Sequence, residues 1–130
     1  MNTIDLAVPA EPEYVGLIRS TAAHIAAHAN LTIDAIDDLR LAVDEAFALL
    51  IAHKPQTGVV AIQFRIHSNQ LSIELTGPAG SPPPDKTSFA WTVLSALVHE
   101  VSTQTSPAGL VTFLLTAKVV ASAYRRLTIS

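Results

Sequence analysis

The sequence predicts an α+β sandwich in which helices cover a single face of one mostly antiparallel sheet. Three observations predict it. Apolar residues recur at helical spacing in long segments, whereas five shorter segments alternate apolar and polar residues as half-buried strands do. Short turns join the later strands into hairpins, whose strands are antiparallel. The order strand, two helices, two strands, loop, helix, two strands then fits two layers around one core.

The first half of the chain contains one predicted strand and two predicted helices. Residues 4–8 alternate apolar and polar and read as a short strand that prolines end. Helical spacing of apolar residues predicts a helix over residues 13–28. A second helix follows, capped by Thr32 or Asp34 and running to about residue 53.

A hairpin and a loop are predicted next. Residues 59–67 and 71–75 alternate apolar and polar on either side of a short polar turn, which favours a hairpin. Residues 77–86 hold four of the eight prolines and two of the five glycines. Proline removes a backbone donor and fixes φ, so this segment is predicted to be a loop.

The chain is expected to close with a helix and a second hairpin. The helix spans residues 88–100, and residues 101–105 and 110–118 form the hairpin. The helix is predicted to turn five apolar residues inward: Phe89, Val93, Leu94, Leu97 and Val98.

Composition excludes several classes of protein. The chain of 130 residues is 49% apolar and 15% charged, which excludes a disordered regulator and predicts one domain over residues 1–130. A net charge of −3, with Arg125 and Arg126 as its only adjacent basic pair, predicts no nucleic-acid partner. Without cysteine there is no disulfide or thiolate chemistry. No apolar run approaches the about 20 residues of a membrane helix, and the acidic start is no secretory signal, so we expect a cytoplasmic protein.

Residues 38–53 carry a resemblance to a known family. They read DLRLAVDEAFALLIAH and resemble the N-box helix of the bacterial anti-sigma serine kinases, roughly D-L-x-x-A-V-[SD]-E-A-x-x-N-A-x-x-H. Residues 88–98, SFAWTVLSALV, stand where that family has its second glycine box and the helix after it, and look closest to the actinobacterial branch that includes the mycobacterial anti-sigma-F factor. The resemblance implies the two-layer Bergerat fold of the GHKL ATPase superfamily.

The resemblance also implies a nucleotide site, which this chain keeps in only one part. In the intact family a glutamate polarises the attacking hydroxyl, and an asparagine one turn further along the helix holds Mg²⁺. Glu45 matches the glutamate, but Leu49 stands in the place of the asparagine. Leucine has no lone pair to offer a hard cation, so Glu45 is expected to be a vestigial general base or simply a solvated helix residue.

The loops that hold ATP in the family are also altered. An Asp-x-Gly-x-Gly motif reads adenine there; here Thr76 stands at the aspartate, with Pro78 and Gly80 in the glycine positions. Gly109 is retained, but Leu110 replaces the threonine that usually follows. Asp85 is an alternative adenine reader, although no glycines follow it. We therefore expect no cofactor, and the alternative is an active kinase that uses ATP and Mg²⁺.

The resemblance further implies protein partners. It makes the chain an anti-sigma factor that binds a stress-response or sporulation sigma factor and is released by an anti-anti-sigma protein. Arg19 matches a first-helix arginine on the face that the relatives use for both partners, and Glu13 lies close to it; a solvated arginine is the alternative. A homodimer through the first helix and first strand is implied as well. Phe89 and Trp91 are expected either to join the core or to fill the space that a nucleotide occupies in the relatives.

Overall fold

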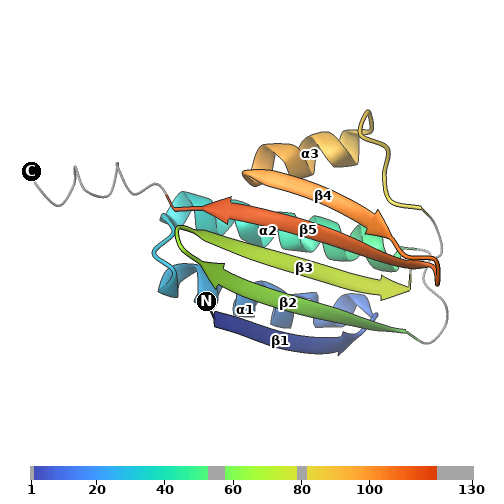
Figure 1. The fold of residues 1–130 in the computed structure, drawn as a ribbon, viewed down its shortest axis with the longest axis horizontal. Coiled ribbons are helices and arrows are strands. Elements are labelled where there is room, and N and C mark those ends of the chain that lie inside the picture. Colours follow the sequence, from blue (N-terminus) through green and yellow to red (C-terminus); the bar gives the residue numbers. More distant parts are fainter. Residues whose placement is uncertain (1, 53–57, 79–81, 120–130) are drawn as a thin grey trace, which may run out of the picture.

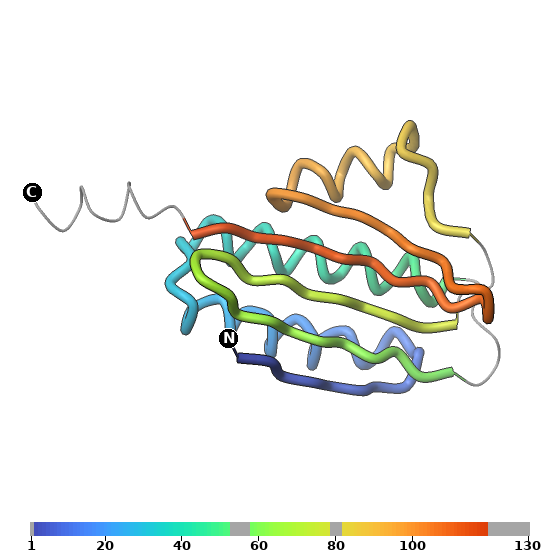
Figure 2. The backbone as a smooth tube through the Cα atoms, viewed as in Figure 1, coloured from blue at the N-terminus to red at the C-terminus, as the bar shows by residue number. Residues whose placement is uncertain are grey.

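The computed structural model describes residues 2–52, 58–78 and 82–119, and it has the predicted α+β architecture (Figure 1). One antiparallel sheet forms the first layer and helices form the second. The tube in Figure 2 shows how the chain brings its first residues beside a strand from its middle. In that pairing Asn2 lies opposite Ile66 and Pro9 lies opposite Val59.

The sheet has five strands in the order β1-β2-β3-β5-β4, and every neighbouring pair is antiparallel. Its strands are β1 (Asn2–Pro9), β2 (Val59–His67), β3 (Gln70–Pro78), β4 (Glu100–Thr105) and β5 (Leu110–Lys118). The strands β1 and β4 therefore form the two edges of the sheet.

The helix layer begins with a short 3₁₀ turn, η1 (Pro12–Tyr14), followed by α1 (Val15–His28), α2 (Ile33–Ile51) and α3 (Phe89–Leu97). Of the two predicted caps for α2, the structure uses Thr32, whose Oγ1 accepts a hydrogen bond from the Ala35 N–H at 3.1 Å. Ser88 caps α3 in the same way, because its Oγ accepts from the Trp91 N–H at 3.2 Å. Each cap satisfies one of the backbone donors that a helix start leaves free.

The core lies between the sheet and the helices α1 and α2. Alternate residues of the strands face the helices, and Phe64, Phe113 and Phe47 are each at most 1% exposed. Burying a side chain of this size contributes about 1.5–3 kcal/mol, so these contacts hold the two layers together. The other face of the sheet is polar, as is usual for an antiparallel sheet with one solvated side.

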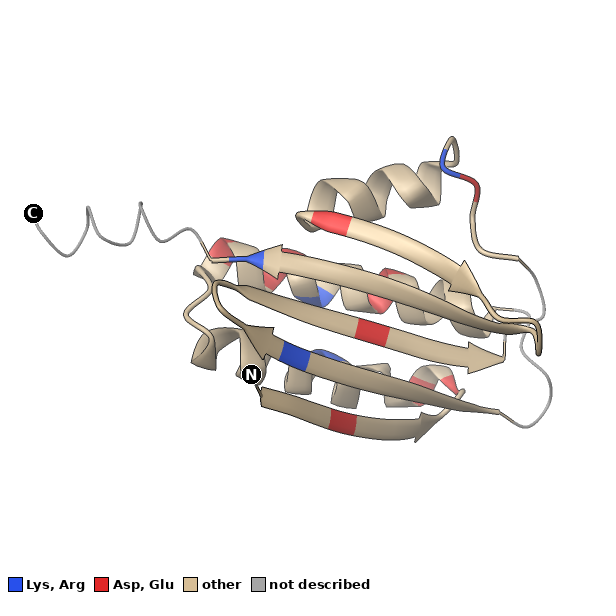
Figure 3. Ribbon diagram, viewed as in Figure 1, with Lys and Arg blue, Asp and Glu red and all other residues tan. Residues whose placement is uncertain are grey.

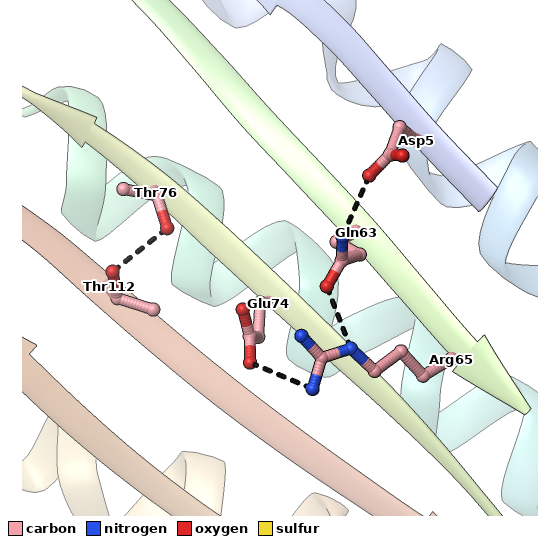
Figure 4. A network of polar contacts seen from close by, with 6 residues as sticks. All are labelled: Asp5, Gln63, Arg65, Glu74, Thr76 and Thr112. Atoms are coloured by element: carbon pink, nitrogen blue, oxygen red, sulfur yellow. Dashed lines mark hydrogen bonds and ion pairs between the residues drawn. The ribbon is translucent and has the colours of Figure 1, made fainter. Parts of the chain in front are cut away.

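Hydrogen bonds and an ion pair tie the strands together across the open face (Figure 4). Gln63 donates to Asp5 at 3.0 Å and accepts from the Arg65 Nε–H at 2.7 Å. Arg65 also lies 3.9 Å from a carboxylate oxygen of Glu74 on β3. This row runs from β1 through β2 to β3 and cross-links the three strands.

Two predicted boundaries were wrong. The strand β3 continues beyond residue 75 through Gly77 and Pro78, and Pro78 can end it because a terminal strand position tolerates a missing N–H. The helix α3 ends at Leu97, so residues 98–100 do not belong to it. Phe89 does not face inward as predicted: it is 84% exposed.

Gly80, Arg125 and Arg126 lie outside the described residues. Among the described residues, no helix combines the length and apolarity needed to cross a membrane.

Candidate functional site

Glu45 and Leu49 lie one turn apart on the same face of α2, as their spacing predicts. Both are partly buried, and Leu49 packs against the hydrophobic core. Among the described residues, Glu45 has no hydrogen-bond or ion-pair partner. One turn after Glu45, the helix thus carries an apolar side chain that packs against the core.

The residues around this pair do not fit a magnesium–nucleotide complex. Mg²⁺ requires oxygen ligands, which Leu49 lacks. Asp44, the neighbouring carboxylate, is engaged by Arg19 on α1 rather than shared with Glu45. Within the described ranges no three His, Cys, Asp or Glu side chains lie close enough together to hold a metal ion. Of these possible ligands, only the carboxylate of Glu45 is therefore left to bind a cation such as Mg²⁺.

Thr76 lies on the open face of the sheet rather than toward the helices. Its hydroxyl shares a 2.8 Å hydrogen bond with the hydroxyl of Thr112 on β5 (Figure 4). The neighbours of Thr76 along β3 are buried on the opposite face, Leu75 at 0% exposure. The side chain of Thr76 is therefore out of reach of a group held between the sheet and the helices.

Gly77 is a helix-facing residue of β3, although its sequence predicts a loop. A Cβ atom at this position would lie 3.2 Å from Val60 Cγ2, 3.4 Å from the Val59 carbonyl oxygen and 3.6 Å from Leu50 Cδ2. The tightest of these contacts is with Val60 on β2, so the glycine leaves room for that side chain, while Leu50 on α2 lies at an ordinary contact distance. If the apolar–polar alternation of residues 71–75 is continued by two residues, Leu75 and Gly77 face the same side of the sheet. This alternation is the sequence feature that could have predicted the facing of both residues.

Gly109 serves the turn between β4 and β5. Its φ is +87°, a left-handed conformation that side chains other than hydrogen disfavour. Its N–H donates to the Ser106 carbonyl at 3.0 Å, and Ser106 Oγ accepts from the Leu110 N–H at 3.0 Å. This geometry accounts for the glycine without a nucleotide.

Asp85 organises the turn that leads into α3. Its Oδ1 accepts from the Thr87 N–H at 2.9 Å and from the Thr87 hydroxyl at 3.0 Å. The backbone hydrogen bond, followed by the hydroxyl, holds the pKa of the exposed Asp85 carboxyl below its ordinary value. One of the two carboxylate oxygens of Asp85 is thus used within the turn.

The helix α3 carries no charge of its own, as Figure 3 shows, and the nearest basic residue is Lys86 in the preceding turn. Lys86 Nζ lies 5.9 Å from the centre of the Trp91 ring. Trp91 is partly exposed and Phe89 is largely exposed, whereas Leu94 is fully buried. The expectation that Phe89 fills a former nucleotide space is therefore wrong, and Leu94 is the residue that anchors α3.

Arg19 on α1 forms an ion pair with Asp44 on α2. Arg19 Nη1 donates to both carboxylate oxygens, at 3.0 and 3.1 Å, and the two side chains are 35% and 33% exposed. Glu13 lies in η1 and is exposed. Glu13 and Arg19 therefore both lie close to the start of α1, and Arg19 is already paired.

Two surface hollows meet at this ion pair. One, of about 350 Å³, is lined by Asp37, Arg40 and Leu41 in addition to the pair. The other, of about 170 Å³, has an apolar wall formed by Pro12, Val15, Phe47 and Ala48. Both hollows are lined by residues of α1 and α2, and Arg19 and Asp44 line both of them.

Comparisons with known proteins agree with this arrangement. Residues 8–115 match the model of the histidine kinase-like ATPase domain. The serine-protein kinase RsbW of Bacillus subtilis is 38% identical over 73 residues, which are 54% of this chain and 46% of that protein. The RsbW of Bacillus pumilus is 33% identical over 86 residues, 62% of this chain and 53% of that protein. The chain spans about half the length of the curated relatives it matches.

A solved structure shares the fold. The RsbU and RsbW domains of Rv1364c from Mycobacterium tuberculosis superimpose with a TM-score of 0.73 at 15% sequence identity. The match covers 91% of this chain and 32% of that one. At this identity the likeness concerns the fold alone.

Proposed function

The chain belongs to the histidine kinase-like ATPase domain family, and from that premise we propose that it is an anti-sigma factor of the RsbW-like kind. It sequesters an alternative sigma factor of the stress-response or sporulation type. An anti-anti-sigma protein releases that factor by competing for an overlapping surface. Such a protein acts where RNA polymerase is, in the cytoplasm.

In this proposal the switch works by partner competition and does not use ATP. The observation that carries this is Leu49, a packed hydrocarbon one turn beyond Glu45. A second observation supports it. The Asp-x-Gly-x-Gly motif can also be aligned one residue earlier, so that Gly77 stands at its first glycine. The fully buried Leu75 then stands at its aspartate. A leucine at that position has no acceptor for the adenine amino group.

The proposed assembly is a homodimer through α1 and β1. The strand β1 is an edge of the sheet, so one side of its backbone pairs with no described strand. Ile4 on this strand is 41% exposed and Leu17 on α1 is 50% exposed, so both elements carry exposed apolar surface.

An ATP-dependent serine kinase that phosphorylates the anti-anti-sigma protein is the second candidate. Glu45 favours it, because this residue is retained and has no partner among the described residues. The curated relatives are also named serine-protein kinases.

Nucleotide titration separates the two candidates. A fluorescent ATP analogue with Mg²⁺ is titrated into the purified chain, with Glu45→Ala as the matched variant and Bacillus subtilis RsbW as the reference. We expect no saturable signal from the chain. Saturable binding that Glu45→Ala abolishes, together with transfer of labelled phosphate to an anti-anti-sigma protein, would establish the kinase instead.

Co-expression tests the sigma-binding role itself. The chain is produced with each alternative sigma factor of its source organism, and the complex is followed by size-exclusion chromatography. We expect one sigma factor to co-elute and an anti-anti-sigma protein to displace it. If every sigma factor elutes separately from the chain, the proposed function is contradicted.

A further inference from the structure

Arg19 uses one of its three guanidinium nitrogens within the molecule. Nη1 makes both hydrogen bonds to Asp44, whereas Nε and Nη2 donate none within the described part of the chain. These two nitrogens form one edge of the planar guanidinium, and such an edge pairs with a carboxylate through two parallel hydrogen bonds.

The surroundings of Arg19 leave room at that edge. A Cβ atom at Gly16 would already lie 3.7 Å from Arg19 Nη2, so the absence of a side chain there keeps this nitrogen uncovered by α1. The pair also lines both of the hollows between α1 and α2. A protein segment that occupies both hollows must cross the Arg19 guanidinium.

We propose that Asp44 is a positioning residue, which holds Arg19 Nη1 so that the Nε–Nη2 edge is presented to a carboxylate of the bound protein. The inference rests on the proposed function and identifies the chemistry of its partner: an acidic side chain. A free arginine loses much rotamer freedom when it binds, and Asp44 has already removed part of that freedom.

The charge of Asp44 acts in the opposite direction, because it repels a second carboxylate. Both members of the pair are about one third exposed, so solvent screens the repulsion. Arg40 in the same hollow is paired with Asp37 at 3.9 Å, so these two charges balance and add neither attraction nor repulsion. In the proposal, the ordering of Arg19 outweighs the screened repulsion.

A double-mutant cycle tests the proposal, with isothermal titration calorimetry against the sigma factor that co-elutes with the wild type. Asp44→Ala is expected to weaken binding about fivefold, the scale of one exposed charge pair, and Asp44→Asn, which keeps an acceptor, less. In an Arg19→Ala background, Asp44→Ala should cause no further loss. Glu74→Gln, which removes a comparably exposed ion pair on the opposite face, is the matched control and should bind like the wild type.

Unchanged or tighter binding by Asp44→Ala overturns the positioning role, and so does an equal loss in the Arg19→Ala background. A second measurement needs no partner. The ¹⁵N relaxation of the Arg19 Nε–H should report an ordered side chain in the wild type and a mobile one in Asp44→Ala; equal mobility refutes the proposal. If no sigma factor binds the wild type, the proposed function fails, and the relaxation data still show whether Asp44 orders Arg19.

Discussion

Thr76 and Thr112 join β3 to β5 through a 2.8 Å hydrogen bond between their hydroxyl groups, on the face of the sheet that the helices do not cover. Because side chains alternate along β3, the contact shows which residues of the strand face away from the helices. Leu75 and Gly77 face the helices, and Thr76 does not. Leu75, which we propose to stand at the adenine-reading position, is thus a buried apolar residue on the helix-facing side.

Thr76→Val is expected to cost about 0.5–1.5 kcal/mol of unfolding free energy, because the Thr112 hydroxyl then loses its partner. Thr112→Val should cost a similar amount. The double variant should be less destabilised than the sum of the two, since both polar groups are then gone. Urea denaturation measures all three; strict additivity would show that the hydroxyls do not interact.

Leu94→Ala is expected to destabilise the protein by about 2–5 kcal/mol, because it empties a fully buried site under α3. Phe89→Ala should lie within about 0.5 kcal/mol of the wild type, since this ring is 84% exposed. Trp91→Ala should fall between them and below the about 3–5 kcal/mol of a fully buried tryptophan. Thermal unfolding ranks the three variants, and a large loss for Phe89→Ala contradicts the ranking.

Gly109→Ala is expected to cost about 1 kcal/mol although there is space for the methyl group. The cost arises from the φ of +87°, which a Cβ disfavours. Gly109→Asn should be milder, because asparagine tolerates the left-handed region better than alanine. If alanine and asparagine are equally stable by chemical denaturation, steric strain at this turn is not the reason for the glycine.

Asp85→Ala is expected to lower stability at neutral pH and to have little effect in acid. The Thr87 hydrogen bonds lower the pKa of the folded-state carboxyl, so their contribution is present while the carboxylate is charged in both states. It is lost as the pH falls through the lowered pKa. Urea midpoints of the wild type and the variant should therefore converge in acid, and a gap that persists there contradicts this account.

Much of the fold could be predicted from the sequence because periodicity and caps agree locally. The bounds of β2 and β5 match their predicted ranges, and α1 and α2 differ by a few residues at their ends. The end of β3 was missed because prolines suggested a loop, yet Pro78 can occupy the last strand position. The orientation of Phe89 was also missed, since an apolar residue in the first turn of a helix has no periodic context before it.

The candidate site was less predictable. Glu45 and Leu49 follow from helix spacing alone, whereas the side of the sheet that Thr76 faces depends on one residue of register. The partner of Arg19 was not predicted, because Asp44 is 25 residues away and on another helix. Spacing within one helix shows which residues share its face, but contacts between helices depend on how those helices pack.

Leu49→Asn introduces the oxygen ligand that the resemblance implies for this position, and we expect that it does not produce nucleotide binding. One amide supplies a single ligand, while Leu75 still lacks an acceptor for adenine and Pro78 still lacks an N–H. The change should also cost about 1–3 kcal/mol, because it places an amide where Leu49 packs against the core. Titration with a fluorescent ATP analogue and Mg²⁺ measures the first effect, and chemical denaturation measures the second. Saturable, Mg²⁺-dependent binding by this variant alone would show that only the magnesium ligand separates this chain from an ATP-binding relative, and would contradict the placement of Leu75 at the adenine-reading position.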